Sequence, residues 1–163
     1  MNAEQLISAL IGAFFGAAGW LLVGLYMQRR LHERQARNAA RAVYFELEVN
    51  RIVVDVARRH SVFRPLSRTS FERLLPELAT WLGADELQTL TRAYMSHAGY
   101  EQAGHDQTIP GSVRAQLLER IVGEHEAASA LLRRRAFSRQ EAARLLGAAA
   151  EAPPGRRRAR NVA

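Results

Sequence analysis

The feature that most constrains this chain is an uninterrupted apolar segment near its N-terminus, Leu6–Met27. No side chain in it is charged, and Ser8 is its one markedly polar residue. Twenty-two helical residues rise about 33 Å, which matches the ~30 Å hydrocarbon core of a bilayer. We therefore predict a single transmembrane helix over residues 6–27, preceded by a short extracytoplasmic N-terminus, residues 1–5.

A cleaved signal peptide is the alternative interpretation of this segment. Signal peptides begin with a basic region and carry a shorter apolar core before a small-residue cleavage site. Met1–Gln5 contains no basic side chain, and the apolar stretch is long and ends directly in Arg29 and Arg30. These departures favour a retained signal anchor in a single-pass protein.

Arginine is distributed asymmetrically around the predicted span. All 23 basic residues are Arg; none precedes the span, and five follow it within residues 28–41. Positive charge flanks the cytoplasmic end of membrane helices, so we predict a C-terminal domain in the cytoplasm, below a bacterial inner or plasma membrane. The same side chains are expected to contact anionic lipid. They are Arg29, Arg30, Arg34, Arg37 and Arg41.

Small residues recur on one face of the predicted span, at Ser8, Gly12, Gly16 and Gly19. Small side chains allow membrane helices to approach closely, which favours association. The sequence leaves three interpretations open: pairing with a second copy, packing against another protein, or no role, because Gly and Ala are common in membrane helices.

No Gly or Pro occurs between Gly24 and Pro65, so the membrane helix is expected to continue to about His60. Residues 28–41 form a basic stalk. From residue 42 an apolar three-four spacing predicts a packed seam, widened by Val43, Leu47 and Val54. The seam residues are Ala42, Phe45, Val49, Ile52 and Val56. Glu46 and Asn50 share a face, where we expect them to hydrogen-bond a neighbouring loop or water rather than form a functional site.

The remainder predicts a helical domain over residues 42–150. Thr69–Glu72 and Ser138–Glu141 resemble capping boxes that open helices. Pro76 should break or kink the first of these helices. Three further helices are expected, over residues 84–98, 113–134 and 138–150. Leu90, Tyr94 and His97 should lie on the buried side of the first, and Val113 should be buried at the start of the second. Gly99–Ser112 reads as a loop.

Residues 151–163 form a predicted disordered basic tail. Its four arginines, Arg156, Arg157, Arg158 and Arg160, have no acidic neighbours after residue 151. Residues 42–151 contain fourteen Arg and fourteen acidic side chains, so the predicted folded domain is neutral and the tail carries excess positive charge.

Motif searches argue against catalysis. The chain has no Cys, which excludes thiolate nucleophiles, disulfides and Cys-ligated metals. His32-Glu33 and His125-Glu126 begin a zinc-binding pattern, but Ala36 and Ser129 occupy the place of its second His. No phosphate-binding Gly loop or nucleophile elbow is present. We therefore expect no enzyme activity, no catalytic or metal-binding residue and no cofactor.

Two resemblances follow from these patterns. Ser138–Gly147 resembles the first helix of small helix-turn-helix regulators, but Ala148–Pro154 follows where a recognition helix is required. The whole layout, with one span, an Arg-rich flank and the Ala-rich helix Ala39–Asn50, resembles uncharacterised small bacterial single-pass membrane proteins. That resemblance implies a membrane-anchored, all-α protein and assigns no activity.

The resulting functional hypothesis is a membrane-anchored helical interaction module that binds a protein partner or itself at the cytoplasmic face. One alternative is a phage or cell-envelope protein whose helical domain lies outside, as in lysis proteins; the Arg asymmetry opposes it. Another is membrane-localised nonspecific nucleic-acid binding through the Arg tail. Lipid headgroups are an equal alternative for the tail, and the anchor makes them the nearer surface. Pathway, partner and oligomeric state are not defined by the sequence.

Overall fold

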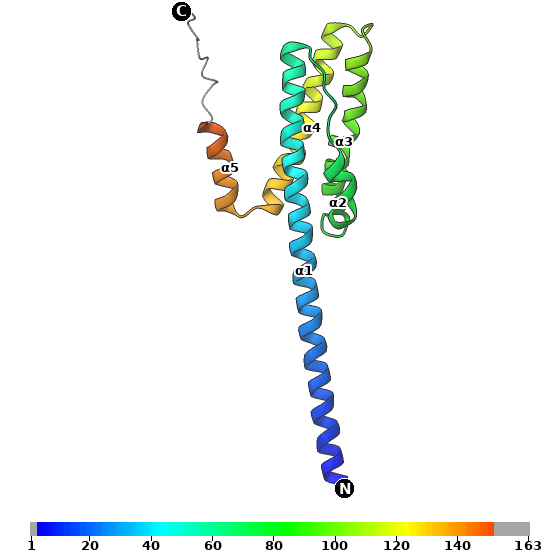
Figure 1. Ribbon diagram of the computed structural model, residues 1–163, viewed down its shortest axis with the longest axis vertical. Coiled ribbons are helices and arrows are strands. Elements are labelled where there is room, and N and C mark those ends of the chain that lie inside the picture. The colour runs from blue at the N-terminus through cyan, green and yellow to red at the C-terminus, as the bar shows by residue number, and fades with distance from the viewer. Residues whose placement is uncertain (1–2, 152–163) are drawn as a thin grey trace, which may run out of the picture.

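A computed structural model of the chain describes the backbone of residues 3–151 and the side chains of residues 13–147. Within these limits the chain forms helices and no strand, so the predicted all-α class is confirmed (Figure 1). The described helices are α1 (Ala3–His60), α2 (Thr69–Ala79), α3 (Ala84–His105), α4 (Gly111–Ala136) and α5 (Arg139–Glu151). The basic tail lies outside the described residues.

α1 is one unbroken helix of 58 residues, as the lack of Gly and Pro after Gly24 predicts. Its N-terminal half projects from the other helices (Figure 1). Side chains from residue 13 to 35 are exposed there, except for half-buried Ala18. In the part of the chain that the structure describes, no helix is both long and apolar enough for a membrane span. The side chains of residues 6–12, which begin the predicted span, lie outside that part.

The C-terminal half of α1 is the central element of a helical bundle. It packs against α4 and α2, and α3 packs against α4. Burial on α1 begins at Ala36, ahead of the change expected at residue 42. Two apolar clusters hold the bundle together. The larger includes Val43, Leu47, Leu78, Leu90, Tyr94 and Leu132; the smaller includes Val54, Leu66, Tyr100, Leu118 and Ile121.

The start of α2 corrects a prediction. Thr69 is not an N-cap: Arg68 occupies that position and makes no side-chain cap. The free amides of Ser70 and Phe71 are instead satisfied by the Glu46 carboxylate of α1. A carboxylate is favoured there because helix N-termini carry unpaired N–H groups and a positive dipole end. Pro76 does not break α2, which continues to Ala79.

α3 continues to His105, beyond the predicted end at residue 98, so the expected loop over 99–112 shortens to residues 106–110. Gly99 and Gly104 are helical and allow close packing. A Cβ at Gly104 would lie 3.0 Å from the Phe63 ring, and one at Gly99 would lie 3.4 Å from Leu117. Val113, expected to be buried, is exposed.

Two chain reversals have clear local causes. Ser61 ends α1 with φ 55°, the left-handed conformation that commonly terminates helices. At α5 the predicted capping box is confirmed: the Ser138 N–H donates to Glu141 Oε2 at 2.7 Å, and the Glu141 N–H donates to Ser138 Oγ at 3.3 Å. The second contact is long, so the Glu141 carboxylate contributes most to this cap.

Candidate functional site

The α1 helix has two apolar faces. The bundle buries one of them, whereas the sequence analysis predicted that the other would form the packed seam. Val43, Leu47 and Val54 are fully buried in the bundle. The predicted seam lies on the opposite side: Phe45, Val49, Ile52 and Val56 are 51%, 57%, 62% and 39% exposed, and Ala42 is half-buried. The prediction of a seam packed within the domain was therefore wrong. We call these five residues the outer seam.

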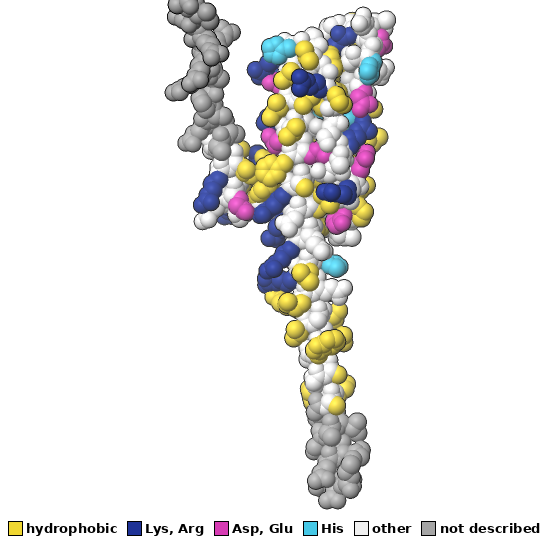
Figure 2. Space-filling view, viewed as in Figure 1, with side chains coloured by type: hydrophobic (Ala, Val, Ile, Leu, Met, Phe, Trp, Pro, Cys, Tyr) yellow, Lys and Arg dark blue, Asp and Glu magenta, His cyan; other side chains and the backbone are white. Residues whose placement is uncertain are grey.

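The outer seam forms part of the hydrophobic surface over α1 in Figure 2. Charged side chains border it, and they pair with one another. Arg51 contacts Glu48 at 3.0 Å and Glu126 at 3.6 Å. Asp55 contacts Arg58 and Arg59, each at 2.8 Å. The border contains three positive and three negative side chains, so it carries no net charge.

α5 meets the lower end of the outer seam through Arg41. This guanidinium donates to both carboxylate oxygens of Glu141, at 2.9 and 3.1 Å, and to the Ala136 carbonyl at 3.0 Å. It also lies 5.1 Å from the centre of the Phe137 ring, which packs edge-on against Phe45. Arg41 therefore joins α1 to α5, and its contact with anionic lipid stays a prediction.

The other juxtamembrane arginines remain available at the surface. Arg29, Arg30, Arg34 and Arg37 are exposed on the projecting part of α1. Arg30 lies over the Tyr26 ring, 5.2 Å from its centre. At about 100° per residue the four fall within one arc of about 140°, so they form a basic face on one side of an exposed helix rather than a pocket.

The predicted small-residue face is described only in part. Gly16 and Gly19 are exposed, and a Cβ at either would meet nothing within 4 Å. The side chains of Ser8 and Gly12 lie outside the described residues, as does the basic tail. Close approach by another helix at Gly16 and Gly19 is sterically open.

Glu46 and Asn50 form the main buried polar cluster on α1, and both bind the segment before α2. Glu46 accepts hydrogen bonds from Ser67 Oγ (2.8 Å), the Ser70 N–H (2.7 Å), the Phe71 N–H (3.2 Å) and the Tyr94 hydroxyl (2.8 Å). Asn50 donates to the Ser67 carbonyl and accepts from its N–H. This pattern confirms the expectation that the pair hydrogen-bonds a neighbouring loop.

The electrostatics of this cluster follow from its hydrogen bonds. Burial alone would raise the pKa of Glu46, but the Ser70 amide and the Tyr94 hydroxyl, with Ser67 and Phe71, outweigh it and hold that pKa below its usual value. Burial and the adjacent carboxylate raise the pKa of Tyr94. The cluster therefore contains a carboxylate that is already satisfied, which is unsuited to proton transfer.

A pair of buried histidines joins α3 to α4. His97 Nε2 and His125 Nε2 lie 3.0 Å apart, and neither side chain is exposed. Sequence reasoning predicted burial of His97, since it follows Leu90 and Tyr94 at helical spacing, but missed its pairing with His125. The spacing of His125 four residues after buried Ile121 was the available signal.

Both imidazoles are neutral in the fold. Burial lowers the pKa of His97 to about 3, helped by the neighbouring His125 and Arg68 and opposed by Glu46. Burial lowers the pKa of His125 to about 4; Glu124 and the Ala93 carbonyl oppose this shift, and Arg51 adds to it. One imidazole must donate its Nε2–H to the other, because two neutral rings share one hydrogen bond.

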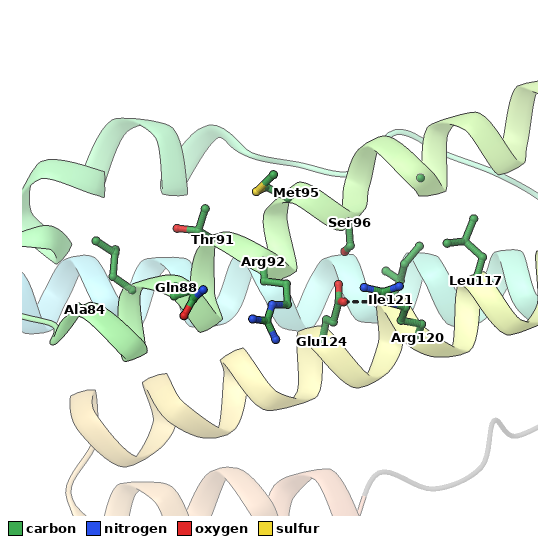
Figure 3. Close-up of a pocket in the computed structure, with 12 residues that line it drawn as sticks. Ala84, Gln88, Thr91, Arg92, Met95, Ser96, Leu117, Arg120, Ile121 and Glu124 are labelled. Carbon is green, nitrogen blue, oxygen red and sulfur yellow. Dashed lines mark hydrogen bonds and ion pairs between the residues drawn. The ribbon is translucent and has the colours of Figure 1, made fainter.

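The described side chains offer no metal site, since no three His or carboxylate groups converge there. A shallow groove of about 690 Å³ runs between α3 and α4. Figure 3 shows Met95 and Thr91 of α3 along it, with Leu117 and Ile121 of α4. The Arg120–Glu124 ion pair, 3.0 Å, lies at its edge. Its lining is mainly apolar and carries no cluster of groups suited to catalysis.

No known protein family, curated protein or solved structure matches this chain.

Proposed function

We propose that this protein is a membrane-anchored, non-enzymatic interaction module. The N-terminal part of α1 would lie in a bacterial inner or plasma membrane as a single span, and the helical bundle would lie at its cytoplasmic face. The proposal rests on the apolar sequence of residues 6–27, the flanking arginines and the absence of a recognisable catalytic set in the sequence.

One observation carries the proposal. α1 is continuous from the apolar N-terminal segment into the bundle core, so the two parts are rigidly coupled. Along the projecting part, large apolar side chains are exposed on all sides, including Phe14 (71%), Trp20 (81%) and Leu22 (67%). Apolar surface of this extent is unfavourable in water and calls for an apolar environment. Leu6, Ile7, Leu10 and Ile11 extend it in the sequence.

The arginines support the orientation of this anchor. Exposed Arg29, Arg30, Arg34 and Arg37 follow directly after the apolar segment, where anionic headgroups would neutralise them. Arg41 supports the orientation less than these four, because Glu141 and Ala136 already bind it.

Membrane extraction tests the anchor. We expect the full chain to remain with bacterial membranes after alkaline carbonate washing and to be released by detergent. Leu21→Arg introduces a charge in the middle of the apolar segment and should release most of the chain into the wash. Met95→Arg, which changes an exposed apolar residue on the bundle, is the matched control and should stay with the membrane. Release of the unmodified chain by carbonate would refute the anchor.

Thiol labelling tests the orientation. The chain has no Cys, so Ala163→Cys introduces one unique reporter. We expect a membrane-impermeant thiol reagent to label it only after lysis. Labelling in intact cells would place the bundle outside and favour the cell-envelope alternative.

A further inference from the structure

The outer seam is one end of a longer pattern on α1. Continuing its three-four spacing towards the N-terminus reaches thirteen positions between residues 14 and 56, and none is charged. This holds even through residues 28–41, which contain five Arg and one Glu. The thirteen positions are Phe14, Ala17, Leu21, Gly24, Gln28, Leu31, Gln35, Asn38, Ala42, Phe45, Val49, Ile52 and Val56.

A single sustained heptad register of this kind is the pattern by which helices form coiled coils. In such a register the thirteen residues alternate between the two core positions of the seven-residue repeat. Val49 and Val56 fall at the first core position, where β-branched residues favour two-stranded pairing.

The structure leaves most of this stripe uncovered, although Phe137 packs edge-on against Phe45. Of the thirteen residues, all are exposed except half-buried Ala42. The bundle instead packs on the opposite face of α1, through Ala40, Val43 and Leu47. α5 stands to one side of α1 in Figure 1, and Phe45, Val49 and Ile52 each remain more than half exposed beside it.

We propose that α1 pairs, in parallel and in register, with α1 of a second copy of this chain along the stripe from Phe14 to Val56. In that arrangement each residue of the stripe faces its own copy, and the two bundles lie on the outer sides of the pair. We infer a second copy as the partner because the stripe is self-complementary: a side-chain amide both donates and accepts hydrogen bonds, so it can pair with an identical amide. Gln28, Gln35 and Asn38 thus hydrogen-bond their copies across the seam.

Charge is compatible with a second copy. The side chains that border the outer seam form ion pairs within one chain and carry no net charge, so two such surfaces do not repel. The arginines of residues 28–41 all lie off the stripe. A strongly acidic or basic partner has no electrostatic preference for this surface.

This inference deepens the proposed function by naming the partner, and it predicts a face different from Ser8, Gly12, Gly16 and Gly19. Membrane extraction and pairing are separate measurements. A monomer that resists carbonate would refute the pairing alone, whereas a dimer that carbonate releases would refute the anchor alone.

Cysteine cross-linking of the full chain in native membranes is the first test. Val49→Cys places a thiol opposite its own copy, where the short Cα separation of a coiled coil permits a disulfide. Met95→Cys is the matched control, since Met95 is exposed at 72% on α3 and away from the stripe. We expect mild oxidation to give disulfide-linked dimer at least about ten times faster at position 49.

The second test measures the mass of the full chain in detergent by light scattering. We expect a dimer that Ile52→Glu dissociates, with the dissociation constant raised about ten-fold or more, and that Met95→Glu leaves intact. Helix content by circular dichroism should be unchanged in both, because both side chains are exposed.

Three outcomes would overturn the proposal. The first is equal cross-linking at positions 49 and 95. The second is a dimer that survives Ile52→Glu but is lost in Gly16→Leu, which would assign pairing to the small-residue face. The third is a monomer in which Val49→Cys and Leu146→Cys together form an intramolecular disulfide, which would show that α5 closes over the outer seam.

Discussion

Mild acid should destabilise the bundle through the His97–His125 pair. In the folded chain the pKa of His97 is about 3 and that of His125 about 4, against an ordinary value of 6.5. Between pH 6.5 and pH 4 the unfolded chain therefore binds protons that the folded chain does not. The stability that the neutral pair provides is fully present above pH 6.5 and is lost as the pH falls through this window.

The size of the effect depends mainly on the unfolded state. At pH 5 both imidazoles are still neutral in the folded chain. The loss of stability is therefore set by protonation of the unfolded chain, because pH 5 lies about 1.5 units below the ordinary histidine pKa. At 1.36 kcal/mol per unit this is about 2 kcal/mol for each histidine, or about 4 kcal/mol for the pair. The Glu46 carboxylate, whose pKa lies below its usual value, contributes only at lower pH.

Urea unfolding of the full chain in a non-ionic detergent, followed by circular dichroism at pH 7 and pH 5, measures this loss. His97→Leu with His125→Leu removes both titrating groups and should abolish most of it. His60→Gln with His105→Gln is the matched control at exposed positions and should leave it unchanged. An equal loss in the chain without the buried pair would refute the reasoning. Imidazole NMR signals assigned to His97 or His125 that titrate near pH 6.5 in the folded chain would refute it as well.

Three further predictions concern single side chains, each checked by urea or thermal unfolding. Glu46→Gln removes a buried charge that accepts four hydrogen bonds, and should lower the free energy of unfolding by about 2–4 kcal/mol. Gly104→Ala places a Cβ 3.0 Å from the Phe63 ring and should lower the free energy of unfolding by about 1–3 kcal/mol. Gly123→Ala, whose Cβ would meet nothing within 4 Å, should raise that free energy by about 1 kcal/mol. Equal effects of the two substitutions would contradict the packing argument. Ser61→Gly removes the strain of a left-handed backbone at φ 55° and should raise the free energy of unfolding by about 0.5–1 kcal/mol. A decrease in that free energy would argue against strain at this position.

The sequence alone was sufficient for the features that depend on neighbours along the chain. The all-α class and the continuous α1 follow from helix propensity without Gly or Pro between residues 24 and 65, because helical hydrogen bonds are local. The capping box at Ser138 and Glu141 was predicted for the same reason, since its partners are three residues apart.

The tertiary structure decided what depends on distant partners. α1 has two apolar faces of similar spacing, and periodicity cannot say which one the bundle covers; packing against α4 and α2 buried Val43 and Leu47 and left Val49 and Ile52 exposed. The amides at the start of α2 are bound by Glu46, which lies 24 residues before Ser70, rather than by a local capping box. The His97–His125 contact likewise joins residues 28 positions apart. Such contacts form only when whole helices are placed against one another, so no local pattern in the chain encodes them.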